Sequence, residues 1–175
     1  AHSPAFTLFC GDLVAGSSNL NTTIAEWKAW LTATSSLTAT RFMVPGNHDM
    51  YPNAGGFNAW RNTFPWLPTS NSPAGEEGIS YYFDVGNTRV ISVTTDWESG
   101  GGLPNQSWLD SVLASSASFD HVFVFSHRPI MFSNSEPTGG SNGAFWQSMV
   151  QADVAGYFSG HWHRYQPDRI TAGGK

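Results

Sequence analysis

The sequence predicts an α/β domain in which parallel strands alternate with helices. Three features support this fold class: short apolar runs without polar alternation, amphipathic segments between them, and a polar cluster directly after several of the runs. Apolar runs of this kind are typical of strands that are covered on both faces, as the parallel strands of α/β folds are. A chain of 175 residues suits one domain better than two, so we expect a single domain over residues 1–175.

Four apolar runs are predicted to be buried strands, and two further runs are predicted to form a hairpin. The hairpin prediction rests on Gly86-Asn87, a turn-forming pair that separates Ile79–Asp84 from Arg89–Thr94. The four buried strands are Phe6–Cys10, Arg41–Val44, Val122–Phe125 and Val154–Phe158.

Three segments between the runs have the apolar spacing of helices. Asn21–Ala33 carries its apolar residues at helical intervals, with Thr22 and Thr23 as candidate caps. Gln106–Ser115 has the same spacing, and Phe145–Gln151 is a shorter candidate. Strands that alternate with helices in this way indicate an α/β domain.

Segments rich in Gly, Pro, Ser and Asn are predicted to be loops. Ser99–Gly102 and Ser133–Gly143 are short loops of this kind. Tyr51–Pro73 also contains two tryptophans and is the expected specificity loop. Trp60 and Trp66 within it are candidates either for a substrate groove or for the core.

Composition excludes several classes of protein. The chain is 40% hydrophobic and 12% charged, whereas a disordered acidic chain has the opposite balance. The formal net charge is -5 and the only lysines are Lys28 and Lys175, so we expect no binding of duplex nucleic acid. No apolar stretch has the length of a membrane span, so no membrane partner is expected, and no partner protein is evident.

Cysteine usage and the choice of polar residues bear on the compartment. Cys10 is the only cysteine, so no internal disulfide can form. Its apolar neighbours indicate a buried small hydrophobe rather than a reactive thiol. Ser, Thr, Asn and Gly are frequent and Lys is rare, as in many exported proteins, so we expect a secreted or periplasmic location.

Each of the four predicted buried strands is followed by a polar cluster. Ligands of α/β folds gather beyond the carboxyl ends of the strands, so these clusters are expected to meet. Imidazole nitrogens together with carboxylate and amide oxygens suit divalent first-row metals, and an open mixed site without thiolates is typical of a catalytic metal. The clusters supply Asp12, Asn47, His48, Asp49, His127, His161 and His163.

Taken one at a time, these residues also have structural interpretations. Asp12 and Asn47 fit turns, and His127 fits a buried core histidine. If the chain is extended at His161-x-His163, the two rings point to opposite sides and could each bind a different metal.

Three further polar residues lie close to the clusters. Asp49 could orient a neighbour or cap the following segment. Arg128 could contact substrate or be a solvated loop residue. Asp96 follows a predicted strand and is expected to shape a loop.

The order of the motifs along the chain resembles the signature of the calcineurin-like metallophosphoesterase family. The resemblance runs from about Phe6 to the C-terminus, and His163-x-Tyr165 is similar to the purple acid phosphatase branch, as is the His-Arg-Pro triplet at 127–129. It implies an α/β/β/α sandwich. The motifs read Gly11-Asp12-Leu13-Val14, Gly46-Asn47-His48-Asp49, Ser126-His127-Arg128-Pro129 and Gly160-His161-Trp162-His163.

In this family two metals share a bridging aspartate, and the resemblance implies that Asp12 is the bridge. One metal would also take Asn47, His127 and His161, a complete set. The other would take His163 with an Asp and a His from a preceding Asp-x-His motif. That motif is absent before the first strand of this sequence. We therefore expect one complete and one incomplete metal site, low activity, and a sandwich that is incomplete at the N-terminus.

Two departures from the family pattern carry further expectations. Ala15 stands where purple acid phosphatases have a ligating tyrosine, so a divalent ion such as Mn, Zn or Fe is expected rather than a stable ferric ion. Ile170–Gly174 looks like a strand that runs into a glycine turn, after which the family usually continues. The sandwich is therefore expected to be incomplete at the C-terminus too.

The resemblance implies hydrolysis of small-molecule phosphate esters, either monoesters or diesters, by attack of a metal-bound hydroxide on phosphorus. His48 would protonate the leaving alkoxide. The alternative is a weakened or inactive domain that keeps the fold and binds a ligand. A serine hydrolase would leave Asn47 and the His161-x-His163 pair unexplained.

Overall fold

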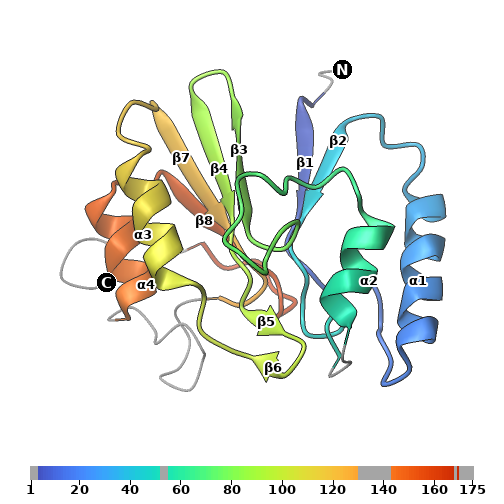
Figure 1. The fold of residues 1–175 in the computed structure, drawn as a ribbon. Coiled ribbons are helices and arrows are strands. Elements are labelled where there is room, and N and C mark those ends of the chain that lie inside the picture. The colour runs from blue at the N-terminus through green and yellow to red at the C-terminus, as the bar shows by residue number, and fades with distance from the viewer. Residues whose placement is uncertain (1–3, 52–54, 130–142, 168, 170–175) are drawn as a thin grey trace.

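The computed structural model describes residues 4–51, 55–129, 143–167 and 169. Figure 1 shows how helices and strands alternate along the chain. The elements are β1 (Phe6–Phe9), α1 (Leu20–Ala33), β2 (Thr40–Met43), α2 (Gly56–Thr63), β3 (Tyr81–Val85), β4 (Thr88–Ser92), β5 (Asp96–Trp97), β6 (Gly100–Gly101), α3 (Gln106–Ala114), β7 (His121–Phe125), α4 (Ala144–Gln151) and β8 (Gly156–Phe158).

Two sheets and two pairs of helices form four layers (Figure 1). The first sheet holds β1 and β2 in parallel, and the second has the order β3-β4-β7-β8. In the second sheet β3 and β4 are antiparallel, whereas β4, β7 and β8 run parallel. Helices α1 and α2 cover the outside of the two-stranded sheet, and α3 and α4 cover the outside of the four-stranded sheet. The predicted α/β/β/α layering and the predicted hairpin are confirmed.

The central strands β4 and β7 are buried on both faces, which explains their lack of polar alternation. Val90 packs into the core between the two sheets, whereas its neighbour Ile91 packs under α3 and α4. In β7, Phe125 likewise packs into the core between the two sheets, and Val124 packs under α3 and α4. Each fully buried aliphatic side chain of this size contributes about 1.5–3 kcal/mol, so a strand with two buried faces is strongly held.

The expectation of full burial is wrong for β1, β2 and β8. In β2, Thr40 is exposed and Arg41 and Phe42 are only partly buried. All four residues of β1 are only partly buried, because β1 pairs with β2 alone among the described strands. Strand β8 is shorter than predicted and ends at Phe158, which is 47% exposed. All three strands lie at the margin of their sheets in the described part of the chain, where one side has no neighbouring strand.

The start of α1 differs from the prediction. The helix begins at Leu20, and Oδ1 of Asn19 accepts the N-terminal hydrogen bond from the Asn21 backbone at 3.0 Å. Neither of the candidate caps, Thr22 and Thr23, therefore fills that role. Thr23 is buried instead, and its Oγ1 accepts a hydrogen bond from the Ser17 backbone at 3.0 Å, which holds the segment before the helix.

Two elements lie inside segments that were predicted to be loops. Helix α2 occupies part of Tyr51–Pro73, and its Trp60 is fully buried against Trp27 at a ring separation of 5.4 Å. Trp60 is thus a core residue. The segment Ser99–Gly102 contains β6, which pairs with β5 in a small hairpin. Most of the predicted loop at 133–143 and the predicted strand Ile170–Gly174 lie outside the described residues.

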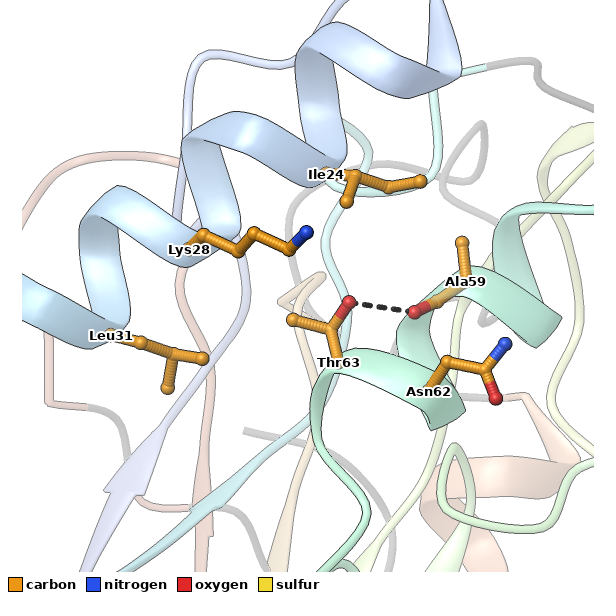
Figure 2. Close-up of a pocket in the computed structure, with 6 residues that line it drawn as sticks. All are labelled: Ile24, Lys28, Leu31, Ala59, Asn62 and Thr63. Atoms are coloured by element: carbon orange, nitrogen blue, oxygen red, sulfur yellow. Dashed lines mark hydrogen bonds between the residues drawn. The ribbon is translucent and has the colours of Figure 1, made fainter.

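A groove lies between α1 and α2 on the outside of the two-stranded sheet (Figure 2). None of the predicted site residues lines it. Its lining consists of Ile24, Lys28, Leu31, Ala59, Asn62 and Thr63. In the described parts of the chain, no helix combines the length and the apolar character that crossing a bilayer requires.

Candidate metal centre

The carboxyl ends of four strands bring most of the predicted site residues together. Parallel pairing aligns the last residues of β1 and β2, Phe9 with Met43, and those of β7 and β8, Phe125 with Phe158. The loops that follow these strands therefore leave the two sheets on one side, which is also the side of the β5–β6 hairpin in Figure 1. This is the place where an α/β fold binds its ligands.

His127 lies at the centre of the cluster and is completely buried. Its Nδ1 lies 2.7 Å from the carbonyl oxygen of Cys10, which can only accept, so Nδ1 carries a proton and donates it. Its Nε2 faces Oδ1 of Asn47 at 3.0 Å, Nδ1 of His161 at 3.1 Å and Oδ2 of Asp12 at 3.2 Å. Four atoms that can offer lone pairs thus converge from four separate loops.

This set of atoms suits a positive ion. The ligand atoms of Asp12, His127 and His161 all lie within 4.8 Å of one another, and Asn47 adds an amide oxygen. Two imidazole nitrogens with a carboxylate and an amide oxygen match divalent first-row metals. The second nitrogen of His127 is held by a backbone carbonyl, an arrangement common around metal-binding histidines.

Asp12 and His127 each shift the pKa of the other. Burial raises the pKa of Asp12, but the hydrogen bond and charge of His127 outweigh burial, so the pKa lies below its ordinary value. Burial lowers the pKa of His127, but the hydrogen bond and charge of Asp12 outweigh it, so the pKa is raised. An ionised Asp12 carboxylate is thus favoured, and it can stabilise either a protonated His127 or a cation bound in its place.

Two glycines allow the loops to close around His127. At Gly11, where φ is +79°, a Cβ atom would lie 2.6 Å from Nδ1 of His127. At Gly46 a Cβ atom would lie 2.8 Å from Cε1 of His127 and would also collide with Asp12. Contacts under 3.0 Å require the neighbour to move, so any larger residue at these positions would displace the ligands.

The His161-x-His163 segment is not extended, so the condition under which its two rings would point to opposite sides is not met. Both histidines have left-handed backbone conformations, with φ of +66° at His161 and +49° at His163. His161 turns into the cluster, whereas His163 is exposed. Among the described residues, the group of titratable side chains close enough to share a metal does not include His163. Strained backbone of this kind is often found at functional sites.

His48 is half-buried beside the cluster. Its backbone N–H donates to Oδ1 of Asp12 at 2.9 Å, and its Nδ1 lies 2.6 Å from the carbonyl oxygen of Ala15. A carbonyl only accepts, so Nδ1 carries a proton and Nε2 is the nitrogen that can gain or lose one. A Cβ atom at Gly16 would collide with the His48 carbonyl, so this loop packs closely against the histidine.

Asp49 orients its neighbours rather than capping a helix. Its carboxylate is almost fully buried and accepts hydrogen bonds from the backbone of Leu13 at 3.2 Å and of Gly46 at 2.9 Å. It also accepts from Nε1 of Trp27 at 2.9 Å. Burial raises the pKa of Asp49 to about 6 although these hydrogen bonds oppose the increase. Asp49 therefore joins the loops after β1 and β2 to α1.

Sequence reasoning underestimated Asp96 and left the role of Arg128 open. Asp96 is 1% exposed, and its Oδ1 accepts from Nε of Arg128 at 2.9 Å and from Nη2 at 2.7 Å. Nη1 of Arg128 lies 3.3 Å from Nε2 of His161, so Arg128 is not a solvated loop residue. The signal that could have found Asp96 is its place just after an apolar strand, as for the other clusters.

The chain matches the family model described as "Calcineurin-like phosphoesterase" over residues 1–165. It therefore belongs to the calcineurin-like phosphoesterase family, a family of metal-dependent phosphoester hydrolases. The resemblance seen in the sequence motifs is thus confirmed.

The chain is also similar to two curated relatives and to one solved structure. "Uncharacterized protein MT2654" and "Uncharacterized protein Rv2577", from two strains of Mycobacterium tuberculosis, are each 28% identical over 197 residues. Each match covers 98% of this chain and 36% of the relative. The purple acid phosphatase PPD1 from yellow lupin seeds shares the fold with a TM-score of 0.62 at 17% identity, over 88% of this chain and 30% of that structure. The chain thus spans about a third of the length of these proteins.

Proposed function

We propose that the chain hydrolyses small-molecule phosphate esters with a divalent ion, Mn, Zn or Fe, held by Asp12, Asn47, His127 and His161. The observation that carries this proposal is the convergence of three ligand atoms within 3.2 Å of Nε2 of His127. Membership of the calcineurin-like phosphoesterase family supports the reaction class. A divalent ion in such a site lowers the pKa of bound water and neutralises charge on the phosphoryl group.

The chain's own residues would prepare the ligands. The Cys10 carbonyl keeps the proton of His127 on Nδ1, so that Nε2 offers its lone pair to the centre. Asp12 offers Oδ2 on the His127 side, while its Oδ1 accepts from the backbone of His48. Each ligand is thus oriented by a second contact and loses little freedom when an ion binds.

His48 is proposed to donate a proton to the leaving alkoxide. The contact of Nδ1 with the Ala15 carbonyl leaves Nε2 as the nitrogen that holds the transferable proton. The backbone contact with Asp12 keeps this histidine beside the metal ligands. A positioned general acid of this type contributes on the order of 100- to 10,000-fold in rate.

His163 is proposed as a ligand of a second ion, shared with Asp12. His163 is exposed, whereas His127 is buried. His163 and Asp12 by themselves make a site with only two protein ligands. Firm metal binding usually needs three or four protein ligands. We therefore propose that the site around His127 binds its ion more tightly than the site at His163.

Metal content per chain, measured together with hydrolysis of an aryl phosphate before and after chelation, tests the proposal. We expect about one tightly held ion and activity that falls on chelation and returns when Mn or Zn is added. Asn47→Ala and His161→Ala are each expected to lose the ion. Asn62→Ala and His121→Ala, two exposed residues outside the cluster, serve as matched controls and should keep it.

The same experiment separates the enzyme from a binding domain that keeps the fold. A folded chain that holds no ion and shows no hydrolysis with added metal would contradict the proposal. An ion held with unchanged occupancy in both ligand variants would contradict the assignment of the ligands.

A further inference from the structure

An arginine lies at the margin of the candidate metal centre. Arg128 follows His127 directly in the chain, and its Nη1 lies 3.3 Å from Nε2 of His161. The other nitrogen of the same ring, Nδ1 of His161, faces Nε2 of His127 at 3.1 Å. One imidazole ring therefore separates the guanidinium group from the centre of the ligand cluster.

The guanidinium group is held in place on its other edge. Nε and Nη2 of Arg128 both donate to Oδ1 of Asp96, at 2.9 and 2.7 Å. A Cβ atom at Gly101 would lie 3.3 Å from Cζ of Arg128, so the β5–β6 hairpin packs directly against the group. The backbone is fixed as well, because Arg128 N–H donates to Oγ1 of Thr95 at 3.3 Å and the Tyr157 hydroxyl donates to the Arg128 carbonyl at 2.6 Å. A donor fixed in this way loses little freedom when it binds a ligand.

The burial of the two partners differs. Asp96 is 1% exposed, whereas the side chain of Arg128 keeps 16% of its surface exposed. A buried ion pair by itself contributes little to stability, because both charges lose their hydration. The pair is therefore better explained by an orienting role for Asp96, with Arg128 reaching the solvent next to the metal ligands. A planar guanidinium group in such a position matches the geometry of phosphate oxygens.

We propose that Arg128 binds an oxygen of the substrate's phosphoryl group through Nη1, while Asp96 holds Nε and Nη2. This inference rests on the proposed function. When Nδ1 of His161 serves as a metal ligand, the proton of the neutral ring is on Nε2, which then cannot accept a hydrogen bond from Arg128. Nη1 lies beside the candidate metal ligands, where it can donate to an anionic oxygen of the substrate.

Inorganic phosphate is the probe for this role. Its dissociation constant would be measured by titration calorimetry on the metal-loaded chain, together with metal content and the thermal unfolding midpoint. Arg128→Met is expected to weaken phosphate binding about 10- to 100-fold, the effect of losing a charged hydrogen bond. Metal content should remain that of the original chain. Arg61→Met is the matched control, because Arg61 also pairs with a carboxylate, Glu77 at 3.3 Å, and contacts no residue of the cluster.

Removing Arg128 leaves the buried Asp96 without its partner, and the single variant could unfold for that reason. The double variant Arg128→Met/Asp96→Asn removes both charges and keeps the test usable. Arg128→Lys retains the charge but lacks the fork of donors, so its phosphate affinity should fall between those of the original chain and the double variant.

Two results would overturn the inference. One is a phosphate affinity equal to that of the original chain in both Arg128→Met and the double variant. The other is a weakened affinity that returns to normal once excess metal restores the metal content, since Arg128 would then act only through His161. Failure of the proposed function looks different, because the unmodified chain itself would then hold no ion and hydrolyse no aryl phosphate. If that chain nevertheless binds phosphate, an equal affinity in the Arg128 variants would still overturn the inference.

Discussion

Nε1 of Trp27 donates a 2.9 Å hydrogen bond to Oδ1 of Asp49, and both side chains are almost completely buried. The other carboxylate oxygen accepts from the backbone of Leu13 and of Gly46, which lie in the loops after β1 and β2. The packing of α1 is thereby coupled to the loops that carry Asp12 and Asn47. Stability and metal binding should therefore respond together to changes at this contact.

Asp49→Asn should destabilise the fold. An amide in place of the carboxylate would direct N–H groups at some of the three donors that now bind Asp49. The expected loss is about 1–3 kcal/mol in the free energy of unfolding, the usual cost of unsatisfied buried hydrogen-bonding groups. Urea denaturation measures it. Asp120→Asn, at an exposed aspartate, is the control, and equal midpoints for the two variants would contradict the prediction.

Trp27→Phe removes the same hydrogen bond from the other side. It should also lose about 1–3 kcal/mol, part of it from lost packing of the indole ring against Trp60 and Phe64. In the double variant with Asp49→Asn the two losses should not add, because both single changes break one contact. Strict additivity in a double-mutant cycle would show that the contact does not couple the two residues.

Gly11→Ala should weaken metal binding more than it weakens the fold. The new methyl group would lie 2.6 Å from Nδ1 of His127 and 2.7 Å from the Gly46 nitrogen, so the ligand would have to move. Gly75→Ala is a close control, because φ is +86° there and a Cβ atom would meet nothing within 4 Å. The zinc affinity of both variants would be measured by titration. Both changes strain the backbone, but only Gly11→Ala also places a methyl group against a ligand, so a lower affinity in that variant alone shows the effect of the collision. Equal affinities would mean that the glycine serves the backbone alone.

Tyr81→Phe should loosen the contact between the two sheets. The buried Tyr81 hydroxyl accepts from the backbone N–H of Met43 at 2.9 Å and donates to its carbonyl at 2.8 Å. Without the hydroxyl, both backbone groups lack a partner at that position, and about 1–3 kcal/mol of unfolding free energy should be lost. Tyr82→Phe, one residue along β3, keeps the ring and should change denaturation little. A larger effect at Tyr82 would refute this account.

Metal ions should stabilise the folded chain through the cluster. An ion that binds only the native state adds about 2.7 kcal/mol to the free energy of unfolding when its free concentration is 100 times its dissociation constant. The thermal midpoint should thus rise when Mn or Zn is added and fall after chelation. In His161→Ala the rise should largely disappear. A rise of the same size in that variant would place the stabilising ion elsewhere.

Much of the fold follows from local patterns in the sequence. Runs such as Val122–Phe125 lack polar residues because β7 is buried on both faces, so the pattern indicated the strand and its environment directly. The turn at Gly86-Asn87 specified the hairpin for a similar reason, because its backbone requirements are local. The motifs at the strand ends indicated Asp12, Asn47, His127 and His161 as candidate ligands.

The tertiary structure decided what depends on residues far apart in the chain. His127 is fixed by the Cys10 carbonyl, 117 positions away, and Arg128 is fixed by Asp96, 32 positions away. No pattern within either segment shows such contacts, because their energies arise only once the sheets have packed. The left-handed backbone at His161 and His163 likewise has no signal in the local sequence, which left an extended segment open. The sequence by itself therefore determined which residues could form the centre, and only the packed structure determined which of them meet and in what orientation.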